Sequence, residues 1–411
     1  MQKKLLGLAV AGALAAPGAA LAQVEVYGFI SVAVSNFKYS DGTAAGTPSV
    51  SKWDVSSHGT NYGVRGRENL GGGLTAWFQI EQNAPMERSN NVAITPASRN
   101  SAVGFQGNWG NFFIGQWTTP WADLESLWSI GAVGGYSPSL SIIGRRETTG
   151  TSPNPNCING HVSGAVGFTT TQPVCDPVEA AGGIGHPFWR RISQSIFYYS
   201  PVFGGAQVKL AYQTNDGKST QSNATTTVAD PSMWSAAVQW SGMGGRARVG
   251  AAFDSHKDFS TIGQTDSGFA IKGGYDFGIV DVGLAYESMT YKSATGDCDA
   301  VQMGVALAIP IGQGHIRASY SQADDLDGTF NGAGTCGAAG AGDNGAKEYT
   351  IGYDYRFSKR TTVGVGYAQI KNDPSAVFTW TGAPGNQSGT GLAPFPGSDP
   401  SAFFLSVIHR F

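Results

Sequence analysis

The sequence predicts an all-β protein, a transmembrane β-barrel of sixteen antiparallel strands with a long constriction loop between strands 5 and 6. Three observations support this prediction. Apolar and polar residues alternate in many short runs, the connections between runs alternate between tight turns and long polar segments, and charged residues make up only 13% of the chain. Soluble domains contain roughly 25% charged residues, so this composition already indicates another class of protein.

The alternating runs carry Val, Ile, Tyr and Phe at every second position, which is the period of a strand with one apolar face. Each run is about ten residues long, the length that a tilted strand needs to cross a bilayer. The clearest runs are VEVYGFISVAV, LTAWFQIEQ, AQVKLAYQT, RARVGAAFD, VDVGLAYES, HIRASYSQA, YTIGYDYRF and TTVGVGYAQI.

The connections determine the number of strands. Tight turns are expected at 71–73, 107–110, 203–205, 242–245, 276–278, 311–314 and 357–360. Longer polar segments are centred near residues 45, 90, 155, 223, 260, 294, 335 and 385. Seven turns and eight loops make fifteen connections, and therefore sixteen strands with both chain ends on the short-turn side. Short turns on one rim and long loops on the other are typical of outer-membrane barrels.

The first 22 residues have the pattern of a secretory signal peptide, with basic MQKK, apolar LLGLAVAGALAA and a cleavage site at Ala20-Leu21-Ala22. We therefore expect residues 1–22 to be cleaved and residues 23–411 to form one barrel domain. Without Lys3 and Lys4, 24 basic residues face 29 acidic ones, and the net charge of about −5 argues against nucleic acid as a partner.

Histidine and cysteine spacing gives no sign of a metal site. The six histidines include no pair at metal-ligand spacing, and the four cysteines form no CxxC motif. We predict neither a metal site nor a cofactor.

A secreted β-sandwich or lectin is the soluble alternative, since it also has alternating strands. Its sheets would leave edges that need protection, whereas a closed barrel pairs every backbone group. Recurring aromatic residues near the expected strand ends favour the barrel, because such rings settle at the headgroup level of a membrane. These residues are Tyr198, Tyr199, Tyr286, Tyr320, Tyr353, Tyr355, Tyr367 and Phe403.

The last strand, FFLSVIHRF, places Phe403, Leu405, Val407, His409 and Phe411 on one face, which we expect to meet lipid. Together with GVRGRENLGGGLTAWFQIEQ, RNSAVGFQGNWGNFFIGQ and SIFYYSPVFGGAQVKLAY, it resembles the general porins of Gram-negative bacteria, particularly the β-proteobacterial type. The resemblance covers the whole mature chain.

This resemblance implies a homotrimer in the outer membrane, surrounded by lipid and lipopolysaccharide, through which ions and small hydrophilic solutes diffuse passively. It also implies that Phe411 is an assembly signal recognised by the outer-membrane barrel assembly machinery.

The segment 117–190 breaks the strand pattern, and so long a loop is expected to be functional. In the porin family the third external loop folds into the barrel and narrows it, and this segment occupies that place. Its first part carries Asp123 and Glu125, with Trp121, Leu124 and Trp128 to anchor it. The alternative is an exposed loop without effect on permeation.

Four arginines are expected to face this loop across the lumen. Arg65 and Arg67 lie opposite Tyr62 and Val64 in the alternation. Arg191 is expected on the face opposite Ile192 and Ile196, and Arg99 matches a position that is basic in the family. On the lipid face an arginine would cost about 2–4 kcal/mol, so the lumen is favoured.

Opposed arginines and carboxylates would select ions by charge, and we predict a weak anion preference. Two observations leave its strength open. The charges could merely solvate the channel wall, and Asn61 replaces a residue that is basic in many porins.

The four cysteines fit an oxidising compartment. Pairing Cys157 with Cys175 and Cys298 with Cys336 needs the least chain displacement among three possible arrangements, and free thiols are the alternative.

Two other functions stay open from the sequence. An enzyme embedded in a barrel would need a nucleophile, a base and an orienting group at one rim, and no such constellation accompanies the histidines of the outer loops. We therefore do not expect an enzyme. A substrate-specific channel for sugars or small organic anions would differ mainly in its lumenal side chains.

Overall fold

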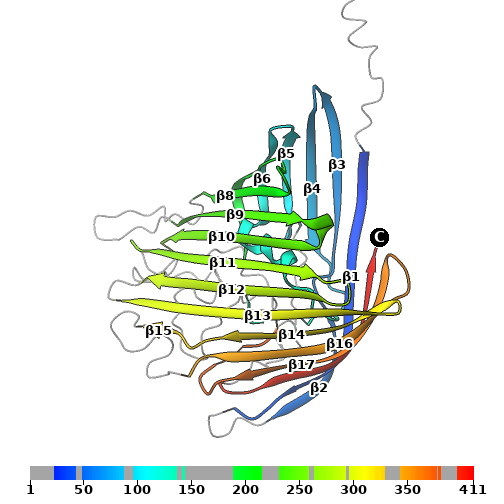
Figure 1. Cartoon of the computed structure of the whole chain (residues 1–411), viewed down its shortest axis with the longest axis vertical. Coiled ribbons are helices and arrows are strands. Elements are labelled where there is room, and N and C mark those ends of the chain that lie inside the picture. The colour runs from blue at the N-terminus through cyan, green and yellow to red at the C-terminus, as the bar shows by residue number, and fades with distance from the viewer. Residues whose placement is uncertain are drawn as a thin grey trace, which may run out of the picture.

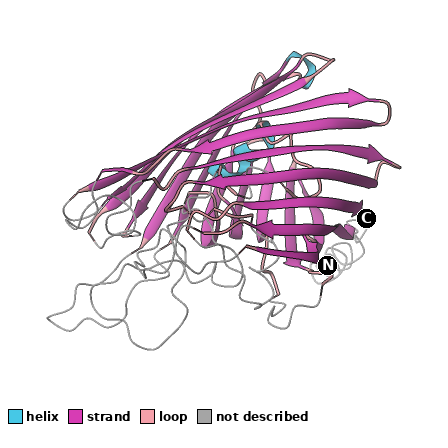
Figure 2. Cartoon of the chain, turned by 90° about the horizontal axis from the view of Figure 1, so that it is seen from below, coloured by secondary structure: helices cyan, strands magenta, loops and turns pink. Residues whose placement is uncertain are grey.

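The computed structural model describes residues 23–42, 49–87, 96–136, 141–143, 188–214, 231–258, 263–292, 296–328, 343–376, 378–380 and 396–411. The expected signal peptide, residues 1–22, lies outside the described residues. Strands dominate the described chain and form one continuous antiparallel sheet that curves around and closes on itself (Figures 1 and 2). Among these residues no helix has the length and apolar character needed to cross a membrane.

The strands are β1 (Gln23–Tyr39), β2 (Val50–Ser57), β3 (Asn61–Gly71), β4 (Leu74–Asn83), β5 (Ser101–Gly107), β6 (Gly110–Thr118), β7 (Arg191–Tyr199), β8 (Ala206–Gln213), β9 (Ser232–Gly242), β10 (Ala247–Lys257), β11 (Thr265–Asp276), β12 (Asp281–Lys292), β13 (Asp297–Ile311), β14 (Gly314–Ala323), β15 (Asp327–Gly328), β16 (Ala346–Arg356), β17 (Thr361–Asn372) and β18 (Pro400–Arg410). The helical pieces are α2 (Pro120–Asp123), η1 (Leu124–Leu127) and η4 (Met243–Gly245).

The eighteen strand segments form sixteen strands of the barrel wall. β2 and β3 both pair with β1 and are two halves of one strand interrupted at residues 58–60. β15 is a two-residue addition to the loop end of β13. With β2 and β3 counted once and β15 left out, β1 to β18 give sixteen antiparallel wall strands, and the predicted fold class is confirmed. The seven tight turns lie where the sequence predicts them.

β6 and β7 are the fifth and sixth strands of the wall. The chain between them is described only at 119–136, 141–143 and 188–190, so the predicted loop as a whole stays a prediction.

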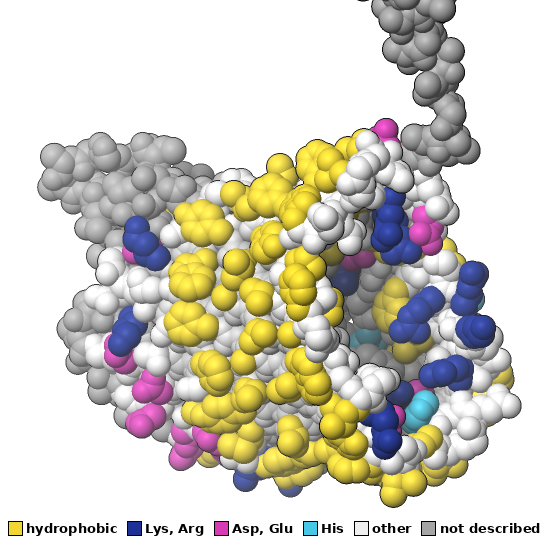
Figure 3. Space-filling model, turned by 45° about the horizontal axis from the view of Figure 1, so that its top comes forward, with side chains coloured by type: hydrophobic (Ala, Val, Ile, Leu, Met, Phe, Trp, Pro, Cys, Tyr) yellow, Lys and Arg dark blue, Asp and Glu magenta, His cyan; other side chains and the backbone are white. Residues whose placement is uncertain are grey.

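Side chains alternate strictly between the outside and the lumen on most strands. On β18, Phe403, Leu405 and Val407 are exposed on the outer face, whereas Ala402 and Phe404 are buried on the inner face. The same alternation exposes apolar side chains on β10, β11, β12 and β16, and Figure 3 shows the broad hydrophobic surface that results. A strand with one face in lipid and one face in water requires this pattern.

The wall closes where its first and last strands meet. β18 pairs with β1 from Phe29↔Arg410 to Tyr39↔Pro400. Beyond this register, the amide of Phe411 donates to the carbonyl of Gly28 and the amide of Gly28 donates to the carbonyl of Phe411, both at 3.1 Å. A Cβ atom on Gly28 would lie only 2.2 Å from the ring of Phe411. The glycine therefore gives the terminal ring a flat surface on the outer face of the barrel.

Two expectations about side-chain direction are wrong. Tyr199 was expected in an aromatic girdle, but it faces the lumen and donates to Asp123 at 3.0 Å. On β7, Ile192 is fully buried while Ile196 is exposed, so the two do not share one face. The pairing of β6 with β7 shifts register between Gly115 and Trp117, and Gln194 has a φ of 49°. Such a bulge breaks the two-residue period, and the alternation argument for Arg191 fails with it.

Cys298, at the loop end of β13, is disulfide-bonded. The other three cysteines lie outside the described residues, so the predicted pairing of Cys157 with Cys175 and of Cys298 with Cys336 stays a prediction.

Replacing Phe411 by Ala should lower the yield of folded barrel in the outer membrane. The variant loses the packing of the ring on Gly28 beside the two backbone hydrogen bonds that close the seam. The yield can be measured as heat-modifiable protein in the membrane fraction. Phe403→Ala removes the same side chain from the same face and is the matched control. Equal yields of the two variants would contradict a special role for the terminus.

Candidate functional site

Residues 119–136, here called the inner segment, lie inside the barrel and follow its wall. The segment begins with α2, where the Thr119 hydroxyl accepts from the amide of Ala122 at 3.2 Å and Pro120 occupies the first turn. η1 follows directly. Trp121, Leu124 and Trp128 are fully buried against wall residues, which supports their expected role as anchors.

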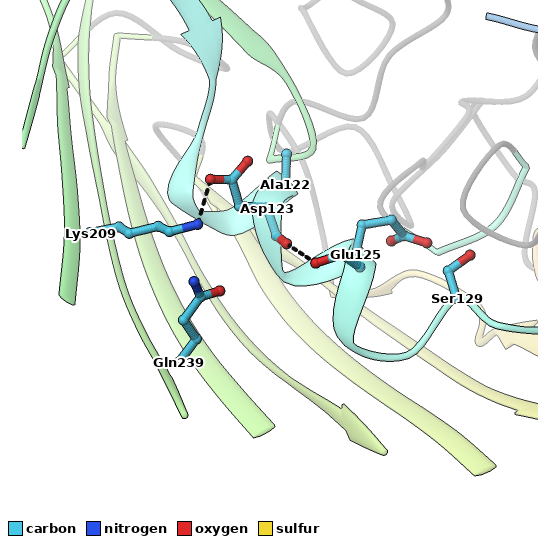
Figure 4. Close-up of a pocket in the computed structure, with 7 residues that line it drawn as sticks. Ala122, Asp123, Glu125, Ser129, Lys209 and Gln239 are labelled. Atoms are coloured by element: carbon cyan, nitrogen blue, oxygen red, sulfur yellow. Dashed lines mark hydrogen bonds and ion pairs between the residues drawn. The ribbon is translucent and has the colours of Figure 1, made fainter. Parts of the chain in front are cut away.

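The two carboxylates of the inner segment are each paired with a wall lysine. Asp123 binds Lys209 of β8 at 2.9 Å and also accepts from the hydroxyls of Tyr199 and Thr118, both at 3.0 Å. Figure 4 shows the lysine reaching from its strand to the start of the segment. Asp123 is therefore held in place by three donors from the wall.

Glu125 takes part in a more deeply buried network. Lys272 of β11 lies 3.3 Å from Glu125 and 2.9 Å from Glu287 of β12. The indole of Trp128 donates to Glu125, and that of Trp121 donates to Glu287, each at 3.1 Å. Lys272 and Glu287 are fully buried, and a buried charge is tolerated only when its partners are in place. The network therefore fixes the segment firmly.

Two arginines hold the backbone of the inner segment. Arg248 of β10 donates to the carbonyl of Leu127 at 2.7 Å, and its other nitrogen binds Asp281 at 2.7 Å. Arg317 of β14 donates to the carbonyl of Ile130 and binds Asp354 at 3.1 Å. These carbonyls have no partner in a regular ladder, so the guanidinium groups supply the missing donors.

Glycines on the lumenal face of the wall make room for the inner segment. A Cβ on Gly283 would lie 2.1 Å from the carbonyl oxygen of Trp128, and one on Gly304 would lie 2.8 Å from the Trp128 ring. On β16 and β17, Cβ atoms on Gly352 and Gly364 would approach Val133 to 3.2 and 3.0 Å. Only the absence of side chains allows this close approach.

The far end of the inner segment reaches the first strand. The hydroxyl of Tyr136 donates to Ser35 of β1 at 2.8 Å, and its ring stacks on Phe404 with the centroids 4.4 Å apart. Burial raises the pKa of Tyr136 to about 12, so the hydroxyl keeps its proton at neutral pH. The segment thus follows the wall from β8 past β14 and β18 to β1.

The four predicted arginines lie on the part of the wall that the inner segment leaves open. Arg65 faces the lumen from β3, binds Glu25 of β1 at 2.9 Å and covers the ring of Tyr27. Arg67 is exposed two residues further along the same strand. Arg99 lies just before β5 and binds Glu81 at 2.7 Å.

Arg191 reaches the inner segment only indirectly. Its guanidinium donates to Asn100 at 2.7 Å, Asn100 lies 3.4 Å from Thr118, and Thr118 donates to Asp123.

Lys209 and Lys272, the partners of Asp123 and Glu125, are not among the residues that the sequence predicts for the site. The alternation of side chains along their strands could have identified them. In AQVKLAYQ, Val208 and Leu210 are exposed to the outside, so Lys209 between them must point inward. Likewise Ile271 is exposed on β11, which directs Lys272 to the lumen.

Beside the inner segment lies a cavity of about 540 Å³, lined by Ala122, Asp123, Glu125, Ser126, Ser129, Lys209 and Gln239 (Figure 4). Its lining is charged or polar apart from Ala122. Within the described residues no group of three or more His, Cys, Asp or Glu side chains is arranged to hold a metal ion.

Comparison with known proteins gives a consistent result. A family model described as Gram-negative porin matches residues 7–375. Outer membrane porin protein 32 of Delftia acidovorans is 24% identical over 390 residues and covers 92% of both chains. The major outer membrane protein P.IB of Neisseria lactamica is 25% identical over 380 residues, with 90% of this chain and 94% of that protein covered.

A solved structure shares the fold. The anion-selective porin from Comamonas acidovorans aligns with a TM-score of 0.64 at 19% identity, covering 95% of this chain and 100% of that one.

Gly283→Ala should displace the inner segment toward the lumen and lower the single-channel conductance. The new methyl group would collide with the carbonyl of Trp128, and overpacking of this kind costs about 1–3 kcal/mol. Gly273→Ala adds the same methyl group to the neighbouring strand β11, where it would approach the carbonyl oxygen of Arg248 in the wall to 2.7 Å and would not meet the inner segment, and it is the matched control. Conductance should fall in the first variant only. Equal conductance in both, with both barrels folded, would show that the segment does not depend on this contact.

Proposed function

Because the chain belongs to the family of Gram-negative porins, we propose that it forms a water-filled channel for passive diffusion of ions and small hydrophilic solutes, with a weak preference for anions. The protein lies in the outer membrane, which its strands cross many times. The observation that carries the proposal is the closed wall of sixteen strands whose inner face is charged and polar while its outer face is apolar.

Barrel size supports diffusion through the lumen. A barrel of eight strands is filled by its own side chains, whereas one of sixteen strands leaves an aqueous channel. The inner segment occupies only part of that space, since it follows the wall from β8 to β1. Solutes would then pass between the inner segment and the opposite wall formed by β3 to β5.

We assign the narrowest part of the channel to Arg65, Arg67, Arg99 and Arg191 on one side and Asp123 and Glu125 on the other. Lys209 and Lys272 neutralise the two carboxylates, while Glu25 and Glu81 bind two of the arginines. With Glu287 included, six cationic groups face five carboxylates, which leaves one net positive charge. So small an excess supports a weak anion preference rather than a strict filter. The porin of Comamonas acidovorans, a structural relative, is also selective for anions.

We expect the assembled channel to be a homotrimer, as the resemblance to general porins implies. Its outer face would contact lipid, lipopolysaccharide and the neighbouring subunits, and Phe411 would serve the barrel assembly machinery as a signal during insertion.

Planar-bilayer recording of the purified protein tests the proposed function. A trimeric open channel should increase the conductance in groups of three equal steps per insertion. Folded, heat-modifiable protein without conductance would contradict the proposed channel function and favour the alternative of an enzyme embedded in the barrel.

Replacing Arg65 and Arg191 by Ala should shift the reversal potential in a KCl gradient toward cation preference. The double variant removes two positive charges from the channel and so changes the local net charge from positive to negative. Charges in a narrow gap between low-dielectric walls act strongly on permeant ions. Arg65→Lys with Arg191→Lys is the matched control, because it alters the same two side chains and keeps both positive charges. A parent that prefers K⁺, or a double variant that behaves like the control, would contradict the assignment.

A further inference from the structure

The short-turn mouth of the barrel is basic, and apart from Arg67 its exposed arginines lie outside the proposed constriction. Arg67, Arg356 and Arg410 occupy lumenal positions at the turn ends of β3, β16 and β18, and Arg246 lies in the turn just before β10, with its guanidinium over the ring of Tyr275. All four are exposed. Figure 3 shows Lys and Arg side chains gathered around a hollow, with few acidic side chains among them.

A count at this end gives a net positive charge. We consider the tight turns together with the five nearest residues of each adjoining strand. The cationic residues there are Arg67, Lys209, Arg246, Arg248, Lys272, Arg317, Arg356, Lys359, Arg360 and Arg410. The acidic ones are Glu25, Glu68, Asp276, Asp281 and Asp354. With the terminal carboxylate, ten cations face six anions. Lys209 and Lys272 are already neutralised by Asp123, Glu125 and Glu287, so the remaining excess at this end is two positive charges.

The same count at the long-loop end has the opposite sign. Outside the inner segment, the described acidic residues there are Asp41, Asp54, Glu81, Glu87, Asp254, Asp258, Asp266, Asp297, Asp299, Asp324, Asp325, Asp327, Asp343, Glu348, Asp373 and Asp399. Apart from Lys209, which lies in the middle of the short strand β8 and is paired with Asp123, the cationic residues are Lys38, Lys52, Arg99, Arg190, Arg191, Lys257, Lys292, Lys347 and Lys371. Sixteen acids against nine cations leave an excess of seven negative charges among the described residues.

A channel with opposite charge at its two mouths does not treat the two directions of current alike. A positive mouth concentrates anions and a negative mouth concentrates cations, because each attracts its counterion within about one Debye length. When the voltage drives each ion in through the mouth that concentrates it, both ions accumulate in the lumen. When the voltage is reversed, each ion must enter through the mouth that repels it, and the lumen is depleted.

We propose that this charge separation makes the channel rectify, so that current is larger when the long-loop side is positive. With that polarity, cations enter through the acidic loop end and anions through the basic turn end. Short turns face the periplasm and long loops the exterior in barrels of this class, so the larger current corresponds to a positive exterior. The inference rests on the proposed channel function, because it concerns the direction of the current through that channel.

Measurements at different ionic strengths distinguish rectification caused by charge from rectification caused by a change in pore shape, because only the former is screened by salt. The Debye length is about 30 Å at 0.01 M salt and about 3 Å at 1 M. The ratio of currents at opposite voltages should therefore be roughly twofold at 0.01 M KCl and close to one at 1 M.

The variant to test is Arg246→Glu with Arg356→Glu, which changes the charge of the turn end by four units and makes its net charge negative. Its rectification at 0.01 M KCl should fall to near one, while its conductance at 1 M KCl stays that of the parent. Arg246→Lys with Arg356→Lys keeps the charge and should keep the rectification. Biotin on Ser358→Cys, a turn residue, reports through one-sided streptavidin which side of the bilayer holds the turns.

The outcomes are distinct. Linear current–voltage curves of the parent at 0.01 M KCl, or a larger current with the turn side positive, would overturn the inference and leave the channel intact. Rectification that persists in the charge-reversed variant would also overturn it. Absence of any conductance from folded protein would instead overturn the proposed function.

Discussion

Everything in this structure depends on the requirement that backbone groups in a membrane be hydrogen-bonded within the protein. A sheet in lipid cannot keep an open edge, so β18 must return to β1. The two hydrogen bonds between Phe411 and Gly28 complete that seam at its turn end. Closure then imposes the alternation on the wall strands, apart from the bulge in β7, because one face meets lipid and the other meets water.

The lumenal half of this alternation holds the inner segment. Short side chains, lysines and arginines recur on the inner faces of β8 to β17, and each fits a particular part of residues 119–136. Glycines make space for Trp128 and Val133, lysines pair with the two carboxylates, and arginines bind backbone carbonyls. The segment is thus bound along most of its length, and its position is a property of the wall as much as of the loop.

Pairing also changes how the lumenal charges act. Most cations of the channel have a carboxylate within ion-pair distance, as in Arg65–Glu25, Arg99–Glu81 and Arg248–Asp281. Such pairs polarise the water between them but contribute little net field at a distance. Selectivity therefore depends on the small excess that remains, and differences between the two mouths become as important as the constriction.

The sequence by itself determined the barrel, its strand number and the direction of most side chains, because a strand between lipid and water has a two-residue period and short turns have recognisable composition. It also located Arg65, Asp123 and Glu125. Only the tertiary structure decided their partners. Lys209 and Lys272 are 86 and 147 residues away from the carboxylates that they bind, and the bulge at Gln194 reverses the face of Ile192. Such contacts arise from the closure of the wall around the inner segment, and no local pattern encodes which distant strands that closure brings together.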